Sequence, residues 1–256
     1  MHLIQFKNFL IISLVIPVLI ISIANLFGEN VAVLTGNLLY IPTSGIFAAI
    51  AVFISLRFGF RGILGKAFLF FAIFGVLWFI ANMIWAYNDL IVGIAPYPSI
   101  ADAFWLAGYP FIFTFMLFYL KLFKKAISKK ILVYSIIIPL VLIGITFDIA
   151  LYTEIEDGLG LFVLTISYPF LDALILIPAI IGIILFLKGE VDWLWSLISL
   201  GILSEAIADI GFFIIQYNFT YYTGHPIEIF FYWTYILCAF GAYSNLKIFR
   251  VQEKKD

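Results

Sequence analysis

Residues 160–187 read GLFVLTISYPFLDALILIPAIIGIILFL. The run contains one charged side chain, Asp172, and it exceeds the ~20 apolar residues that an α-helix needs to cross a lipid bilayer. A helix of this composition has no polar face to present to water. The stretch therefore predicts a membrane-spanning helix.

The rest of the chain has the same character. Its 256 residues are 65% hydrophobic and 11% charged, whereas soluble domains are about 45–50% apolar and about 25% charged. A net charge of −1 and a single cysteine, Cys238, exclude a nucleic-acid-binding protein and a disulfide scaffold. We predict an all-α integral membrane protein of the cell membrane, with one transmembrane domain over residues 1–256. Its eight apolar stretches are 8–27, 37–56, 66–87, 99–120, 131–151, 160–187, 193–216 and 226–246.

The basic residues are sorted along the chain. All 14 Lys and Arg fall near the two termini or in the links after the second, fourth and sixth stretches. Because Lys and Arg stay on the cytoplasmic side of membrane proteins, this pattern predicts eight transmembrane helices with both termini cytoplasmic. The opposite links carry acidic residues and no basic ones: Glu29, Asp89, Glu154, Glu156 and Asp157.

The sequence also repeats itself. The two halves, about residues 1–129 and 130–256, match at offsets of 122 to 127 residues. Each half holds four predicted helices, and an even number makes both halves enter the membrane from the same side. We therefore predict two parallel four-helix repeats, related by a pseudo-twofold axis along the membrane normal. The matching pairs include Pro17 with Pro139, Asn82 with Asp209, Asp102 with Glu228, and Tyr109 with Tyr235.

Six carboxylates fall within the predicted helices, where no Lys or Arg can pair with them. They are Asp102, Asp148, Asp172, Glu205, Asp209 and Glu228. Carboxylates in the hydrocarbon layer are costly and mark function or a satisfied polar core. One interpretation makes them helix caps and polar links between helices. The other makes them part of an outward-facing cavity that binds a cation or holds protons.

Aromatic residues crowd the same outer ends. They are Trp85, Tyr87, Tyr97, Trp105, Tyr109, Tyr217, Phe219, Tyr221, Tyr222 and Tyr232. They fit an interfacial belt or an aromatic-walled pocket. His225 and Glu228 could share a metal, but the other histidine, His2, lies on the far side, so the metal stays unassigned. The motifs of nucleotide-binding loops are absent, and we expect no cofactor.

Several short motifs resemble a known group of proteins. Residues 96–110 read PYPSIADAFWLAGYP, residues 167–172 read SYPFLD, and residues 222–228 read YTGHPIE. They resemble the multi-span N-terminal sensory region of archaeal and bacterial signalling proteins, such as histidine kinases and diguanylate cyclases. The resemblance implies a sensor module. This chain ends seven residues after Phe249 without an output domain, so the resemblance implies signalling through a cytoplasmic or membrane partner.

These observations predict a stand-alone sensory or ligand-binding module in the lipid bilayer, without enzymatic activity, that binds a small ligand or cation. The alternative is a small proton- or cation-coupled secondary transporter in which Asp172, Glu205 and Asp209 carry the coupling ion. An intramembrane enzyme with paired carboxylates is a third hypothesis. The predicted ligand-binding residues are Asp102, Trp105, Tyr109, Tyr168, Asp172, Glu205, Asp209, His225 and Glu228.

Overall fold

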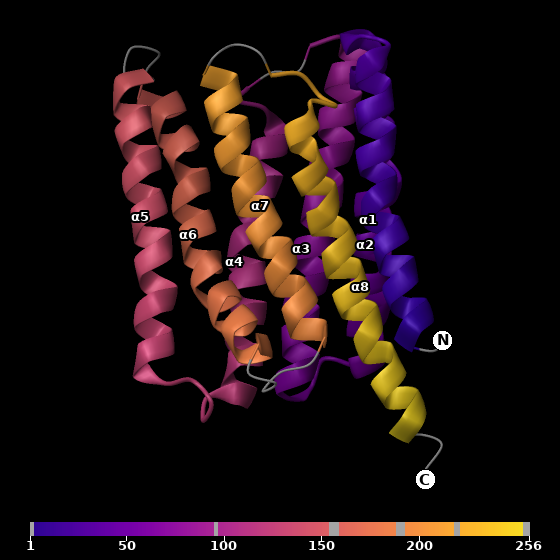
Figure 1. Ribbon diagram of the computed structural model, residues 1–256, viewed down its shortest axis with the longest axis vertical. Helices are drawn as coiled ribbons and strands as arrows, with labels where there is room; N and C mark the ends of the chain where they lie inside the picture. Colours follow the sequence, from indigo (N-terminus) through magenta and orange to yellow (C-terminus); the bar gives the residue numbers. More distant parts are fainter. Residues whose placement is uncertain (1–2, 95–96, 154–158, 188–192, 218–220, 253–256) are drawn as a thin grey trace.

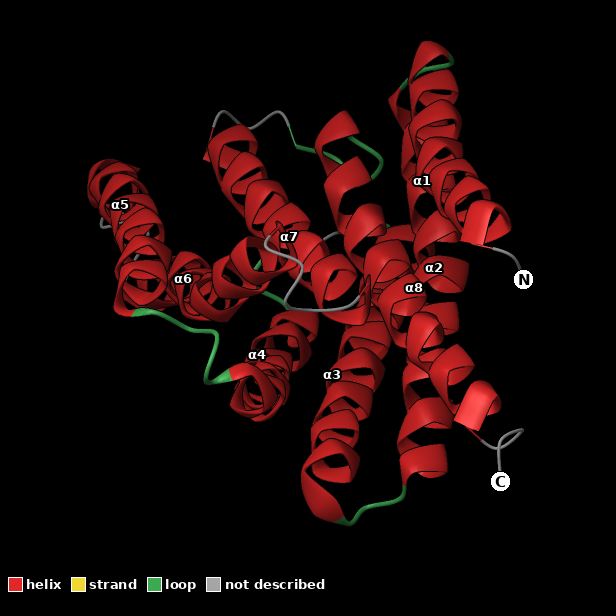
Figure 2. Cartoon of the chain, turned by 60° about the horizontal axis from the view of Figure 1, so that its bottom comes forward, coloured by secondary structure: helices red, strands yellow, loops and turns green. Residues whose placement is uncertain are grey.

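The computed structural model describes residues 3–94, 97–153, 159–187, 193–217 and 221–252. Within these residues the chain folds into eight α-helices and no strand (Figures 1 and 2). The helices are α1 Leu3–Leu26, α2 Glu29–Phe58, α3 Gly62–Tyr87, α4 Ile100–Leu120, α5 Lys129–Thr153, α6 Leu159–Leu187, α7 Trp193–Tyr217 and α8 Ile229–Gln252. A π-helical turn, Asn88–Val92, follows α3. A short 3-10 turn, Lys121–Phe123, follows α4, and another, Pro226–Glu228, precedes α8.

The helices have the lengths and surfaces of membrane helices. Within the described residues, seven of them, all except α5, are long and apolar enough to cross a membrane. The outer faces carry large apolar side chains such as Ile11 and Leu38, while Glu228 is only 1% exposed. Soluble proteins show the reverse distribution, so the fold indicates a multi-pass membrane protein.

The second helix is longer than the sequence predicts. The apolar stretch was expected over 37–56, but α2 begins at Glu29. Polar residues between 29 and 37 interrupt the apolar pattern, so the sequence does not indicate the first turns of this helix. One of them, Asn37, is buried, and its amide donates to the carbonyl of Val33 at 2.9 Å and to Asp89 at 2.6 Å. A polar side chain that faces neighbouring helices therefore does not mark a loop here.

Most pairs of helices that are consecutive in the chain pack against one another. In each half consecutive helices pair, with α2 against α3, α3 against α4, α6 against α7 and α7 against α8. Contacts of α2 with α8 and of α4 with α6 join the two halves. Helix α1 packs against α2 and α8, whereas α5 packs on α6 at the edge of the bundle (Figure 2). Both labelled chain ends lie toward the lower part of Figure 1.

Aromatic side chains fill the interior near that lower end. Phe47, Phe71, Phe74 and Phe115 are fully buried and pack ring against ring, with 4.7 Å between the centroids of Phe71 and Phe115. They come from the later part of α2, the first half of α3 and the later part of α4. This aromatic core closes the bundle beneath the site described next.

Candidate functional site

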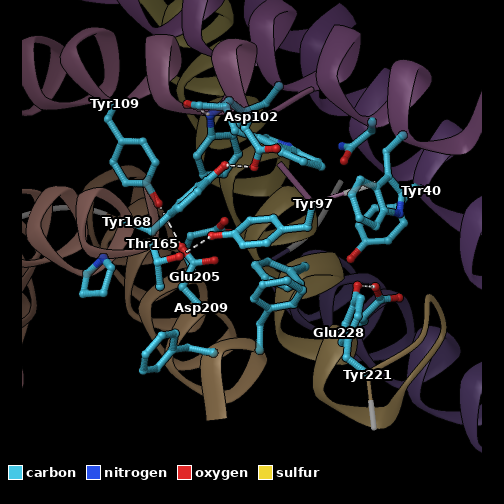
Figure 3. A pocket seen from close by; sticks show the side chains of 18 of the residues that line it. Tyr40, Tyr97, Asp102, Tyr109, Thr165, Tyr168, Glu205, Asp209, Tyr221 and Glu228 are labelled. Carbon is cyan, nitrogen blue, oxygen red and sulfur yellow. Dashed lines mark hydrogen bonds between the residues drawn. The ribbon is translucent and has the colours of Figure 1, made fainter. Parts of the chain in front are cut away.

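A cavity lies between the helices in the half of the bundle away from the chain termini. Its walls come from the middle of α2, the later parts of α3 and α7, the early parts of α4, α6 and α8, and Tyr97 and Tyr221 in the segments before α4 and α8 (Figure 3). Its volume is about 90 Å³. For comparison, a cavity needs about 10–15 Å³ to hold one water molecule. The cavity therefore has room for several waters or a small organic molecule.

The lining combines carboxyl groups with aromatic rings. The four described carboxyl-bearing residues in its wall are Asp102, Glu205, Asp209 and Glu228, and none of the described Lys or Arg side chains lines it. The basic residues whose side chains the structure describes lie at the opposite end of the bundle; they are Lys7, Arg57, Arg61, Lys66, Lys121, Lys124, Lys125, Lys129 and Lys130. The cavity consequently has acidic groups without cationic partners of its own.

Tyr109 joins two of the acids. Its hydroxyl lies 2.9 Å from Asp172 Oδ1 and 2.8 Å from Asp209 Oδ2. A phenol has one proton to donate but can also accept. Both contacts are satisfied when Tyr109 donates to one carboxylate and the other carboxyl group carries a proton that it donates to the phenol oxygen. The three side chains come from α4, α6 and α7 and so tie these helices together.

Glu205 has an oxygen without a partner. The side chain is 5% exposed and lines the cavity near the middle of α7. Its Oε2 makes no hydrogen bond within the described residues, and Oδ2 of Asp172, which is 2% exposed, makes none either. A buried carboxyl oxygen without a donor is costly, so Glu205 is the group in this wall best suited to accept from a bound ligand.

Asp102 and Glu228 are, by contrast, fully engaged. Asp102 accepts from the backbone N–H of Ser99 at 2.6 Å, and this bond is part of the N-terminal cap of α4. It also accepts from the hydroxyl of Tyr168 at 2.7 Å (Figure 3). Glu228 accepts from the hydroxyl of Tyr221 at 2.5 Å and from the N–H of Gly224 at 2.6 Å. These two carboxyl groups organise the wall of the cavity.

Residues 221–228 form a connection that is hydrogen-bonded to α1 and α3 and packs against α2. The hydroxyl of Tyr222 donates to Asn25 at 2.5 Å, and the Asn25 amide donates to the carbonyl of Gly224 at 2.9 Å. The indole of Trp85 donates to Thr223 at 3.0 Å. Gly224 has a φ of +85° and lies against the backbone of α2. The connection therefore forms a fixed wall of the cavity through Tyr221 and Glu228.

His225, a predicted site residue, lies outside the lining of this cavity. Its Nδ1 accepts from the backbone N–H of Ile227 at 3.2 Å, and its ring packs edge-on against Tyr222. Among the described residues no group of three or more His, Cys, Asp or Glu side chains is arranged to hold a metal ion. In this geometry His225 starts the turn before α8, with Nδ1 unprotonated.

We expect His225 to titrate below the ordinary histidine value of 6.5, because burial lowers its pKa. A lowered pKa in the folded state stabilises the protein above the unfolded pKa, and this stabilisation is lost as the pH falls through the folded value. A proton NMR titration of a His2→Gln variant, in which His225 is the single imidazole, measures this directly. A midpoint at or above 6.5 would contradict the assigned role of Nδ1 as an acceptor.

The other predicted site residues gather at one place. Trp105, Tyr109, Tyr168 and the four acids of the wall line the cavity, and Asp172 adjoins it through Tyr109. Asp148 falls in α5 outside the described side chains, as does Tyr217 in α7, and Phe219 is not described at all. The aromatic residues at these helix ends differ in position. Trp85 and Tyr109 are buried and line the cavity, whereas Tyr87 is exposed, as a residue of an interfacial belt would be.

Sequence reasoning missed several lining residues, among them Tyr40, Trp78 and Thr165. They stand in apolar runs with no charge beside them. The repeat could have revealed Tyr40, because it precedes Tyr168 by 128 residues, close to the offset between the halves.

Comparison of the chain with protein families, curated proteins and solved structures finds no match. Its chemistry must therefore be inferred from the cavity itself.

Proposed function

We propose that the protein is a membrane sensory or ligand-binding module whose cavity binds a small organic cation. The observation that carries this proposal is the Oε2 of Glu205, which has no hydrogen-bond partner among the described residues and is buried in an acidic wall to which they contribute no Lys or Arg. A carboxylate can only accept, so the ligand must bring a hydrogen-bond donor, and a positive charge would balance the acids. A protonated amine meets both requirements.

The surrounding rings suit the same ligand. Trp78, Trp105 and Tyr235 line the cavity together with Glu205. Aromatic faces attract cations, and the attraction strengthens when water is excluded. The amine would lie between Glu205 and Asp209, which are one helical turn apart on α7, with aromatic rings around its carbon atoms.

The aromatic core favours a binding site over a transport pathway. Phe47, Phe71, Phe74 and Phe115 fill the bundle between the cavity and the basic end. A ligand reaching Glu205 thus meets packed rings between the cavity and the basic end. We infer that binding is read out by a cytoplasmic or membrane partner, as the resemblance to sensory regions suggests.

Proton- or cation-coupled transport is the second candidate, and the arrangement at Tyr109 favours it. Asp172 and Asp209 meet at one phenol near the middle of the bundle, and pairs of acids of this kind carry protons in transporters. This candidate requires the aromatic core to open during the transport cycle.

We also propose that the fold consists of two parallel four-helix repeats with eight spans and cytoplasmic termini. Two hydrogen bonds support the repeat. Asn82 donates to Tyr235 at 2.8 Å between α3 and α8, and Tyr109 lies 2.8 Å from Asp209 between α4 and α7. These pairs occupy matching positions in the two halves, and the α2–α8 and α4–α6 contacts match in the same way. Glu205 and Asp209 would then be the acidic counterparts of Trp78 and Asn82.

Titration of the protein in lipid nanodiscs with propylamine tests the proposed function. We expect saturable binding that Glu205→Gln and Asp209→Asn each weaken by about tenfold to a hundredfold, because each change removes a charged hydrogen-bond acceptor. Glu29→Gln, at an exposed acid at the same end of the bundle, should leave the affinity unchanged. Equal binding by all four proteins would exclude this site. Propylamine-dependent proton flux in vesicles, lost in Asp209→Asn, would instead support the transporter.

A further inference from the structure

A second cavity adjoins the acidic one. It lies between α5, α6 and α7, has a volume of about 200 Å³ and has an apolar wall throughout. Thr165, Pro169 and Phe213 line both cavities. The hydroxyl of Thr165 bonds to Tyr97 at 3.1 Å on the acidic side (Figure 3), so it does not make the second cavity polar.

The second cavity borders the lipid-facing surface. Phe147 of α5 and Phe170 of α6 lie in its wall and are 44% and 49% exposed. In the described part of the chain α5 packs on α6 and is not held against α7 (Figure 2). The space over α6, between α5 and α7, is therefore bounded by side chains that face the bilayer.

The two cavities differ in what they can hold. An apolar cavity of ~150 Å³ stays free of water and binds a hydrocarbon such as benzene, so the larger apolar cavity here suits a hydrocarbon group. The acidic cavity suits a hydrogen-bond donor with a positive charge. Thr165, Pro169 and Phe213 stand between the two cavities, so a single molecule with both parts occupies the pair only when these side chains move apart.

We propose that the ligand is an amphiphilic amine, with its head at Glu205 and Asp209 and its alkyl chain in the second cavity, and that it enters from the bilayer between α5 and α7. This inference rests on the proposed function, since it assigns the head to the same two acids. It adds the chemical class of the ligand and its route.

Two probes of different length test the inference in lipid nanodiscs. Propylamine reaches only the acidic cavity, whereas decylamine also needs the second one. Ile166→Trp places an indole in the second cavity, and we expect it to weaken decylamine binding by about tenfold or more while leaving propylamine binding unchanged. Val163→Trp, at an exposed position of α6 outside that cavity, is the matched control and should change neither affinity.

The outcomes separate the two proposals. If both amines bind through Glu205 and Ile166→Trp affects them equally, the acidic site stands and the amphiphile assignment is wrong. If neither amine shows binding that Glu205→Gln weakens, both proposals fail. A decylamine analogue with a diazirine near its tail provides a measurement on the unaltered protein. Crosslinks should map to α5 and α6 around Ile143 and Ile166, and crosslinks confined to other helices would overturn the inference.

Discussion

Gly224→Ala should lower the free energy of unfolding by about 2–5 kcal/mol. Gly224 has a φ of +85°, and a left-handed backbone costs an ordinary residue about 1–2 kcal/mol. A methyl group there would also collide with the carbonyl oxygen of Ala32 in α2, and overpacking of this kind costs about 1–3 kcal/mol. Denaturant titration in mixed micelles measures the change.

Gly93→Ala is the matched control. Gly93 also has a positive φ, +77°, but no atom lies within 4 Å of the place its methyl group would take. We expect Gly93→Ala to cost about 1–2 kcal/mol, which is the backbone contribution alone. Equal losses for the two variants would show that the approach of Gly224 to α2 contributes nothing. Gly224→Ala should also abolish propylamine binding, because the displaced connection takes Tyr221 and Glu228 out of the cavity wall. Gly93→Ala should keep it.

Tyr109→Phe should cost about 3 kcal/mol, the upper part of the range for hydrogen bonds to charged groups. The Tyr109 hydroxyl is hydrogen-bonded to both Asp172 and Asp209. Its removal takes one hydrogen bond from each of these carboxyl groups inside the bundle. Phenylalanine keeps the ring in place against Trp78, so the loss reports the hydroxyl rather than the packing. The measurement is again the free energy of unfolding in mixed micelles.

Tyr168→Phe provides the comparison. Asp102 loses the Tyr168 hydroxyl but keeps the N–H of Ser99, so we expect a cost of about 1.5 kcal/mol. A double-mutant cycle between Tyr109→Phe and Asp209→Asn should show coupling of about 1–3 kcal/mol, because the two side chains act through one contact. Additive effects would mean that Tyr109 and Asp209 stabilise the protein independently.

Much of the helical architecture could be predicted from the apolar runs. The run at 160–187 corresponds closely to α6, because a helix that is apolar on every side has only lipid or protein to face. The start of α2 could not be predicted in this way, since Asn37 looks like a loop residue until Asp89 is brought beside it. Such a partner, 52 residues away, is a tertiary contact that local patterns do not contain.

The acids of the cavity could be chosen from the sequence by the cost of burying them, but their roles could not. Asp102 and Glu205 look alike in the sequence. The structure separates them, because Asp102 accepts from Ser99 and Tyr168 while Glu205 keeps an oxygen without a donor. His225 was among the predicted ligand-binding residues, yet its Nδ1 accepts from the backbone N–H of Ile227 at the start of the turn before α8. Local hydrogen bonding, which depends on the folded geometry, decides between these roles.

The hydrogen bond from Asn25 to the carbonyl of Gly224 can form only late in the synthesis of the chain. The two residues are 199 positions apart. At about 5–20 residues per second, a ribosome needs roughly 10–40 s to make the chain between them. During that interval the Asn25 side chain and the Trp85 indole have been inserted, but the residues that bond to them do not yet exist. The N-terminal half must therefore wait in the membrane for the last connection, and its final packing is completed only as α8 is inserted.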